Sequence, residues 1–512
     1  MHIDGKTLPA RARLRFHVCV IGAGAAGITV ANEFPAGSSA LGLIESGGWL
    51  PDQTQSLYDG ETSESIPERL SYLTASRVRY FGGTTNVWTG WCRPLDESDF
   101  DEREWVPHSG WGMPFSALSS YYGPAAQICD IHGFEYDQAQ EGHLQSVASL
   151  GRHGGLRTRF FHYSPPTRFG VKFREALVAS RNVTVATHLN VTELVLDPSG
   201  RFITHVLART LDGNEVAILA RWFVLSSGAI ENARLLLCSN SLSKQGIGNQ
   251  RGLVGRFFME HPHVMRGIVL ARKSDPRLLG YRSRTDGGPL GHEIHGVFSP
   301  SEEFQRDRKT LNFAAQIMNK PLSPAGGELA LGRSLLLTSG QPPGRMVRSD
   351  FENVGVEIRT EQAPDPENRV VLSSKLDPFG KNRAKLIWKL NDIEIHTLEE
   401  ALKGLSSELG LSSLGRLRRI PGDVVTASEN AYKFDGARLR LWHHHMGTTR
   451  MSPSDASGVV DPDCKVHGVE NLFVAGSSVF ATSGFANPTL TIVALSLRLA
   501  RHLKSRIREG GS

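Results

Sequence analysis

The sequence predicts an α/β, Rossmann-like nucleotide-binding domain interwoven with an α+β domain built on an antiparallel sheet. Three observations predict this fold. A glycine-rich turn links an apolar strand to a helix near the start of the chain, similar strand–turn segments recur far downstream, and segments of alternating apolar and polar residues lie between them. Because the two kinds of segment alternate along the chain, each domain is expected to be assembled from several pieces.

The first strand–helix–strand unit lies near the start of the chain. Residues 16–21 form a short apolar run that ends in glycine, which is typical of a buried parallel strand. Residues 25–34 carry apolar side chains at helical spacing, and Pro35 ends that helix. A second apolar run, 40–44, finishes at Glu45 and completes the unit.

Two more strand–turn units follow much later. Residues 222–225 lead through a Ser-Ser-Gly turn into a helix over 230–238, and residues 471–475 lead into a Gly-Ser-Ser turn. Between them, residues 183–196 and 354–390 alternate apolar and polar side chains, as half-buried antiparallel strands do.

The expected division of the chain follows from this order of segments. The nucleotide-binding domain is expected to comprise residues 14–95, 182–268 and 441–508, and the substrate-binding domain residues 96–181 and 269–440. A helix of mainly apolar residues, beginning near Thr489, would be buried inside the first of these domains.

Composition excludes several classes of protein. The chain has 512 residues, of which 40% are hydrophobic and 21% charged, so it can bury a large core without disulfides or metals. The net charge of +5 is small and the basic residues are scattered along the chain, which argues against a nucleic-acid partner. No run of about 18 apolar residues is present, so no membrane span is expected. The five cysteines form no CxxC pair, which fits a reducing compartment, and without a signal-like segment the expected location is the cytoplasm.

The glycine-rich turn predicts a dinucleotide site. Gly22 permits the tight turn, Gly24 lets the backbone approach a pyrophosphate, and Gly27 allows close packing of helix on strand. Glu45, 18 residues after Gly27, is placed to hold a ribose hydroxyl and to repel a 2′-phosphate. A nucleotide-free α/β turn is the structural alternative. The second glycine-containing strand end, at Gly476, suits the middle of a long dinucleotide and favours FAD over NAD.

The C-terminal part contains the candidate catalytic residues. Three consecutive histidines, 443–445, precede a Gly-Thr turn, and Asn487-Pro488 precedes the apolar helix. Alternation along a strand would point His444 away from its two neighbours, and no carboxylate stands at ligand spacing, so no metal site is expected. Asn487 suits the N-cap and Pro488 the first helical position. The buried helix start could also stabilise negative charge on a reduced flavin, with Asn487 beside the reacting centre.

Together with further motifs, these residues resemble the glucose–methanol–choline (GMC) oxidoreductases, in their pyranose-oxidase-like, glycoside-oxidising branch. The resemblance covers nearly the whole chain. The motifs are residues 22–27 with Glu45, 81–88, 254–256, 260–262, 361–362, 372–373, 377–380, 443–451, 459–461, 466–469 and 486–491.

The resemblance implies an FAD-dependent oxidase or dehydrogenase that converts CH–OH to C=O on a sugar, glycoside or similar polyol. It implies that His444 takes the hydroxyl proton as base, that Asn487 hydrogen-bonds the same oxygen, and that hydride passes to flavin N5. Oxygen or another acceptor would then reoxidise the flavin. Some pyranose oxidases carry a histidine bonded covalently to FAD, and Val87 takes the matching position here, so FAD is expected to be non-covalent.

The residues expected to contact FAD lie in several segments. They are Gly22, Gly24, Ala25, Ala26, Gly27, Glu45, Gly82, Gly83, Thr84, Asn86, Val87, Trp88, Val191, Ser227, Gly228, Gly476, Ser477, Pro488 and Thr489. Gln362 and His445 are expected to contact the substrate, and residues 280–348 to shape its pocket.

The sequence is also compatible with other functions. The substrate could be a hydroxyl on a natural-product scaffold, or the protein could be a non-redox lyase that keeps FAD, as lyases of the family do. An NAD-dependent reductase is a third possibility. A serine hydrolase is disfavoured because no GxSxG turn follows a strand.

Overall fold

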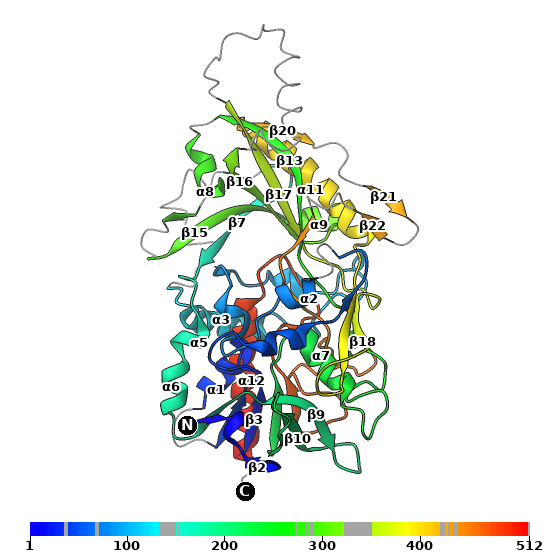
Figure 1. Cartoon of the computed structure of the whole chain (residues 1–512). Helices are drawn as coiled ribbons and strands as arrows, with labels where there is room; N and C mark the ends of the chain where they lie inside the picture. Colours follow the sequence, from blue (N-terminus) through cyan, green and yellow to red (C-terminus); the bar gives the residue numbers. More distant parts are fainter. Residues whose placement is uncertain are drawn as a thin grey trace.

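The protein is built around two large sheets, one parallel and one antiparallel, which lie at opposite ends of the molecule in Figure 1. The computed structural model describes residues 1–34, 39–66, 71–132, 150–151, 153–272, 275–282, 284–286, 291–321, 351–419, 425–428, 431–433 and 439–509. The predicted helix end at Pro35 lies outside these residues, as does much of the predicted pocket segment 280–348.

The parallel sheet contains the glycine-rich turn. Its six strands follow the order β1 (His2–Asp4), β8 (Val183–Thr187), β4 (Leu41–Ile44), β3 (Val18–Ile21), β12 (Trp222–Leu225) and β24 (Leu472–Val474), and every neighbouring pair is parallel. Each residue of β3, β4 and β12 is buried, as expected where both faces of a parallel sheet are covered. The sheet therefore brings strands from both ends of the chain side by side.

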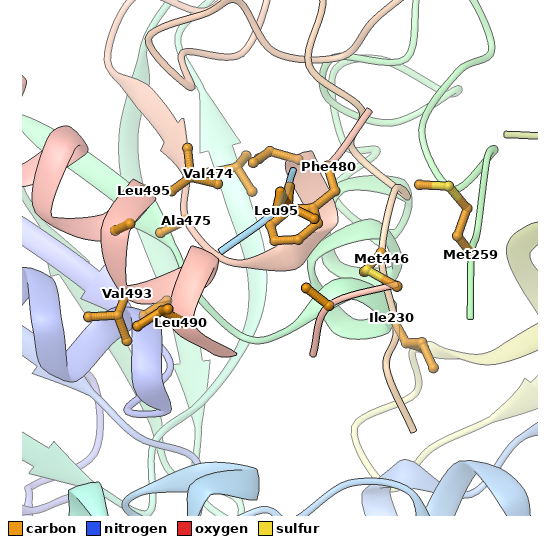
Figure 2. Close-up of a cluster of buried hydrophobic side chains, with 14 of the residues drawn as sticks. Leu95, Ile230, Met259, Met446, Val474, Ala475, Phe480, Leu490, Val493 and Leu495 are labelled. Carbon is orange, nitrogen blue, oxygen red and sulfur yellow. The ribbon is translucent and has the colours of Figure 1, made fainter. Parts of the chain in front are cut away.

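Helix α1 (Ala25–Asn32) packs on β3 and β4 of this sheet. Further helices in the same half of the molecule are α3 (Ser116–Ile128), α7 (Ala229–Cys238) and α12 (Thr489–Glu509). The apolar residues of α12 are buried because the helix packs against both α1 and α3, and it runs through the centre of the lower half of Figure 1. Figure 2 shows part of the resulting core, in which Leu490 and Val493 of α12 and Val474 of β24 belong to one cluster of buried side chains. The start of α12 is consequently held inside the molecule.

Three smaller sheets and several short helices complete the fold. The smaller sheets are β2 (Ala12–Arg15), β11 (Glu215–Leu219), β10 (Ile203–Arg209) and β9 (Asn190–Leu196); β18 (Arg369–Leu376), β19 (Asn382–Ile387) and β5 (Glu61–Thr62); and β21 (Val425–Ser428) with β22 (Ala431–Lys433). The short helices are α2 (Tyr72–Ala75), α5 (Phe169–Lys172), α6 (Arg174–Ala179), α8 (Leu279–Arg282) and α9 (Glu302–Arg308).

The second large sheet is antiparallel. Its strands are β20 (Gly415–Arg419), β13 (Pro262–Arg272), β17 (Phe351–Thr360), β16 (Phe313–Pro321), β15 (Glu293–Pro300), β7 (Leu156–Tyr163) and β6 (Trp91–Cys92), with β14 (Thr285–Asp286) beside β15 and β23 (Leu439–Leu441) beside β13. Helix α11 (Asp392–Leu411) packs against β20, β13, β16, β17 and β7. The predicted pairing of a parallel-sheet unit with an antiparallel-sheet unit is thus present.

Three details differ from the sequence prediction. Residues 183–187 form the parallel strand β8 rather than half of an antiparallel pair, because β8 lies between β1 and β4 and is buried there. Helix α3 falls in the segment 96–181 yet packs on α12, since its apolar face is buried against that helix. Strand β13 joins the antiparallel sheet from Pro262, before the expected boundary at 268. The domain boundaries otherwise stay a prediction.

Candidate active site

The glycine-rich turn has the geometry that its three glycines predict. Gly22 has a φ of +103°, and a Cβ on Gly27 would lie 1.9 Å from the carbonyl oxygen of Gly22. Both positions therefore need glycine for the turn and for close packing of α1. A Cβ on Gly24, in contrast, would have no protein atom within 4 Å, and no side chain caps α1 at Gly24. The start of α1 thus leaves open space where backbone N–H groups can meet an anion.

Glu45 and the loop that follows α2 close around this turn. The carboxylate of Glu45 accepts hydrogen bonds from the backbone N–H groups of Ala23 and Gly47, each at 2.9 Å. The N–H of Gly82 donates to the carbonyl of Ala23 at 2.8 Å. A Cβ on Gly83 would lie 3.0 Å from the Cα of Gly24, so the loop and the turn are nearly in contact.

A single cavity connects the turn with the histidine segment. Sixteen of the nineteen residues predicted to contact FAD line it, namely Gly22, Gly24, Ala25, Ala26, Glu45, Gly83, Thr84, Val87, Trp88, Val191, Ser227, Gly228, Gly476, Ser477, Pro488 and Thr489. The same cavity is lined by His443, His444, His445 and Asn487. These residues fit a long dinucleotide, because an open helix start, a buried carboxylate and a polar reactive end lie along one space.

Three predicted FAD contacts do not line the cavity. Gly27 lies beneath the turn against Gly22, as described above. Gly82 has a φ of +99°, and the side-chain nitrogen of Asn86 donates to the carbonyl of Phe81 at 2.9 Å. These residues therefore shape the turn and the loop, and their direct contact with FAD stays a prediction.

The expectation that the three histidines alternate along a strand is wrong. Strand β23 ends at Leu441, and His443 has a φ of +64°, in the left-handed region. All three histidines line the cavity, so they do not alternate between opposite faces of a strand. Among the described residues, no group of three or more histidine, cysteine, aspartate or glutamate side chains could hold a metal ion.

His444 and Asn487 meet at one end of the cavity. The side-chain nitrogen of Asn487 lies 3.2 Å from Nε2 of His444, and its oxygen accepts a hydrogen bond from Arg359. Nδ1 of His444 lies 2.9 Å from Nδ1 of His261. Burial, followed by the charges of His261 and Arg359, lowers the pKa of His444 well below 6.5, so its imidazole is neutral at neutral pH.

A buried carboxylate accepts hydrogen bonds from the backbone of the histidine segment. Glu260 is completely buried, and its Oε2 accepts the backbone N–H groups of His261 at 2.9 Å and His444 at 3.0 Å. Its other oxygen accepts from the hydroxyl of Tyr72, which also lies 3.1 Å from Nε2 of His445. Burial raises the pKa of Glu260 to about 7. Glu260 thus links His261, which directly precedes strand β13, to the histidine segment.

Two predicted roles near the site are corrected. Gln362 does not line the cavity, because it is fully buried and its side-chain oxygen accepts from the backbone of Glu260 and from Trp388. It supports Glu260 rather than a substrate. Asn487 does not act as the predicted N-cap: α12 begins at Thr489, the carbonyl of Pro488 accepts its first hydrogen bond, and the Asn487 side chain contacts His444 and Arg359.

A second charged cluster lines another part of the cavity. Arg77 pairs with Glu231 at 2.9 Å, and its guanidinium lies 3.9 Å from the ring centre of Tyr58. Although burial acts in the opposite direction, Arg234 and Arg77 lower the pKa of Glu231 to about 2. No sequence motif pointed to this cluster.

Sequence reasoning also missed His261, Glu260 and Arg359. Glu260 and His261 stood in one of the motifs that resemble the family, which was the available signal, but the motif carried no assigned role. Arg359 lies at the end of β17 and reaches Asn487 only through the fold.

The chain is similar to several known oxidoreductases. A family model described as GMC oxidoreductase matches residues 364–496. The chain is 26% identical to 6'''-hydroxyparomomycin C oxidase of Streptomyces lividus over 99% of this chain and 94% of that protein. It is 33% identical to C-glycoside 3-oxidase of Microbacterium trichothecenolyticum over 64% of this chain and 55% of that protein. The crystal structure of a formate oxidase shares the fold with a TM-score of 0.61, at 17% identity, covering 98% of this chain and 100% of that one. Within the part of the chain that the structure describes, no helix is both long and apolar enough to span a membrane.

Proposed function

We propose that this chain is an FAD-dependent oxidoreductase of the GMC family and that it oxidises a hydroxyl of a sugar, glycoside or similar polyol. The observation that carries the proposal is the His444–Asn487 pair at 3.2 Å, in the same cavity as the glycine-rich turn and Glu45. A neutral imidazole beside an amide donor can accept a proton from an alcohol while its oxygen stays hydrogen-bonded.

The reaction needs a proton acceptor and a hydride acceptor. His444 takes the hydroxyl proton, and Asn487 donates to the same oxygen and orients the carbon. FAD, when bound, supplies the acceptor for the carbon-bound hydrogen as hydride at N5. Oxygen or another acceptor then takes the two electrons.

The residues proposed to hold FAD follow the cavity from one end to the other. The start of α1 at Gly24 receives the pyrophosphate, and Glu45 receives a ribose hydroxyl. Val87 lies along the cavity in the loop after Gly82 and has no nucleophilic atom, which supports non-covalent attachment.

The substrate class is supported by the names of two relatives. One is an oxidase of a hydroxyparomomycin and the other an oxidase of C-glycosides, and both have diverged far from this chain. The cavity wall contributes Trp91 and Trp442, whose rings suit the apolar face of a sugar. A glycoside with a free hydroxyl is therefore the proposed substrate.

Anaerobic stopped-flow reduction of the bound flavin tests this proposal directly. Sugars, glycosides and polyols are mixed with the holoenzyme, and bleaching of the flavin band is followed before oxygen is admitted. At least one glycoside is expected to bleach the band in wild-type protein. His444→Ala is expected to slow that reduction by on the order of a hundredfold or more while FAD stays bound.

Two results would contradict the proposal. Near-normal reduction of the flavin in His444→Ala would remove the assigned base. Formation of product without any bleaching would instead support a lyase that keeps FAD.

A further inference from the structure

We propose that His261 is a positioning residue that sets the tautomer of His444, so that His444 presents an unprotonated Nε2 to the substrate. The inference rests on the proposed role of His444 as base. It follows from a chain of hydrogen bonds in which each donor determines the next acceptor. One end of this series of hydrogen bonds is the backbone carbonyl of Gly484, and the other end is the guanidinium of Arg359.

The first end of the chain is the carbonyl oxygen of Gly484. Nε2 of His261 lies 2.8 Å from this oxygen. A carbonyl oxygen can only accept a hydrogen bond, so Nε2 of His261 carries a hydrogen. Burial lowers the pKa of His261 well below its ordinary value, so the ring is neutral and holds only that one hydrogen. Its Nδ1 is therefore an acceptor.

The second step passes this constraint to His444. The Nδ1 atoms of His261 and His444 lie 2.9 Å apart. Because Nδ1 of His261 can only accept, Nδ1 of His444 must donate and must carry the hydrogen. A neutral imidazole has one hydrogen, so Nε2 of His444 keeps a free electron pair. This is the atom that faces Asn487.

The other end of the chain leads independently to the same assignment. Arg359 can only donate, and its Nη1 contacts the side-chain oxygen of Asn487. The amide nitrogen of Asn487 therefore faces Nε2 of His444, 3.2 Å away, and donates towards it. That contact is favourable only if Nε2 of His444 is unprotonated. Constraints from Gly484 and from Arg359 thus agree on one tautomer.

Backbone hydrogen bonds and close contacts hold the residues of this hydrogen-bond series in place. Oε2 of Glu260 accepts the backbone N–H groups of both His261 and His444, which ties the two histidines together. Gly484 has a φ of +52°, and a Cβ there would lie 2.5 Å from a carboxylate oxygen of Asp99, so its carbonyl is closely held. The two rings are also nearly perpendicular, with centres 5.0 Å apart and an angle of 82° between their planes.

Two variants of His261 separate the tautomer effect from a general structural effect. Asn carries its amide at the δ position, where its oxygen can accept from Nδ1 of His444. Gln carries its amide at the ε position, where it can donate to Gly484 but offers no acceptor to His444. Melting temperature and FAD content of the holoenzymes His261→Asn and His261→Gln serve as controls for folding.

The main readout is ¹⁵N NMR of holoenzyme containing ¹⁵N-labelled histidine. The His444 signals are identified by their loss in His444→Gln. In wild-type protein we expect a protonated Nδ1 and an unprotonated Nε2. His261→Asn is expected to keep this pattern, whereas His261→Gln shifts His444 towards the Nε2-protonated form.

Flavin reduction gives the functional readout. His261→Gln is expected to reduce flavin about tenfold more slowly at saturating substrate, with His261→Asn recovering most of that rate. A protonated Nε2 in wild-type His444 would overturn the inference, and so would equal tautomers and equal rates in the two variants. If His444→Ala retains flavin reduction while the tautomer is as expected, the role of His444 as base fails instead, and the two failures are distinguishable.

Discussion

The guanidinium of Arg359 donates to the side-chain oxygen of Asn487, and this contact turns the amide nitrogen of Asn487 towards Nε2 of His444. Arg359 is buried, with its guanidinium 5.1 Å from the ring centres of both Trp91 and Phe161. Burial lowers the pKa of Arg359 to about 10, which still leaves it charged at neutral pH. The orientation of the candidate catalytic amide therefore depends on a residue of the antiparallel sheet.

Replacing Arg359 with Met should slow flavin reduction by about tenfold or more, because the Asn487 amide loses the donor that orients it. Met fills the space between the two rings without introducing a polar atom, so FAD content should not change. Stopped-flow reduction measures the effect. Arg416→Met, at an exposed position of β20 in the same sheet, is the control and should leave the rate unchanged. An unaltered rate in Arg359→Met would refute the positioning role.

Two alanine substitutions in the glycine-rich turn should have different effects. Gly27→Ala places a Cβ 1.9 Å from a carbonyl oxygen, so it should lower the melting temperature of the protein even without FAD. The Cβ that Gly24→Ala adds has no protein atom within 4 Å, so the apoprotein should keep its stability while its affinity for FAD falls. Thermal unfolding and FAD titration of both apoproteins test this contrast. Equal loss of stability in the two variants would contradict it.

The rate of flavin reduction should not depend on protonation of His444 between about pH 6 and pH 8. Burial and the neighbouring His261 and Arg359 lower the pKa of His444 well below its ordinary 6.5. The ring therefore stays neutral as the pH falls through 6.5, and the base is lost only at a much lower pH. Reduction rates at saturating substrate across this range provide the measurement. A rate that halves near pH 6.5, and that keeps this midpoint when Glu260, whose pKa is raised to about 7, is replaced by Gln, would show that His444 titrates as an ordinary histidine.

The buried ion pair of Arg103 with Glu361 should contribute strongly to the free energy of unfolding. The two side chains form a bidentate pair at 2.6 and 2.8 Å, and Glu361 is completely buried. Arg103→Met leaves a buried carboxylate without its partner and should cost about 3–5 kcal/mol, measured by denaturant unfolding. Arg251→Ala removes the exposed pair with Asp455 and should cost at most about 1 kcal/mol. Similar losses in both variants would rule out this explanation.

Local sequence patterns predicted the parts of the fold that depend on neighbouring residues. The apolar runs before Gly22 and Gly476 became strands of one parallel sheet, because short apolar segments that end in glycine can be buried on both faces. The pattern failed at residues 183–187, where alternating side chains resemble an antiparallel strand but β8 lies inside the parallel sheet. Periodicity cannot identify the neighbours of a strand.

The candidate site shows the same limit at the level of single residues. His444 and Asn487 could be named from their motifs, but their immediate partners could not. Gln362 stood in a recognised motif and was expected to contact the substrate, yet the fold turns it towards the backbone of Glu260. Contacts between residues far apart in the chain depend on how sheets and helices pack, and no local pattern records them.

The glycine-rich turn and Glu45 were determined by the sequence alone, because glycines at fixed spacing allow only a few backbone paths between strand and helix. Only the tertiary structure decided which atom of His444 faces Asn487. That atom depends on His261, on Arg359, and on Gly484 and Asn487 of one loop, which lie on three separate segments and meet through hydrogen bonds of fixed direction. The direction of each hydrogen bond depends on the positions of its atoms, and these positions are set only when the two sheets pack together.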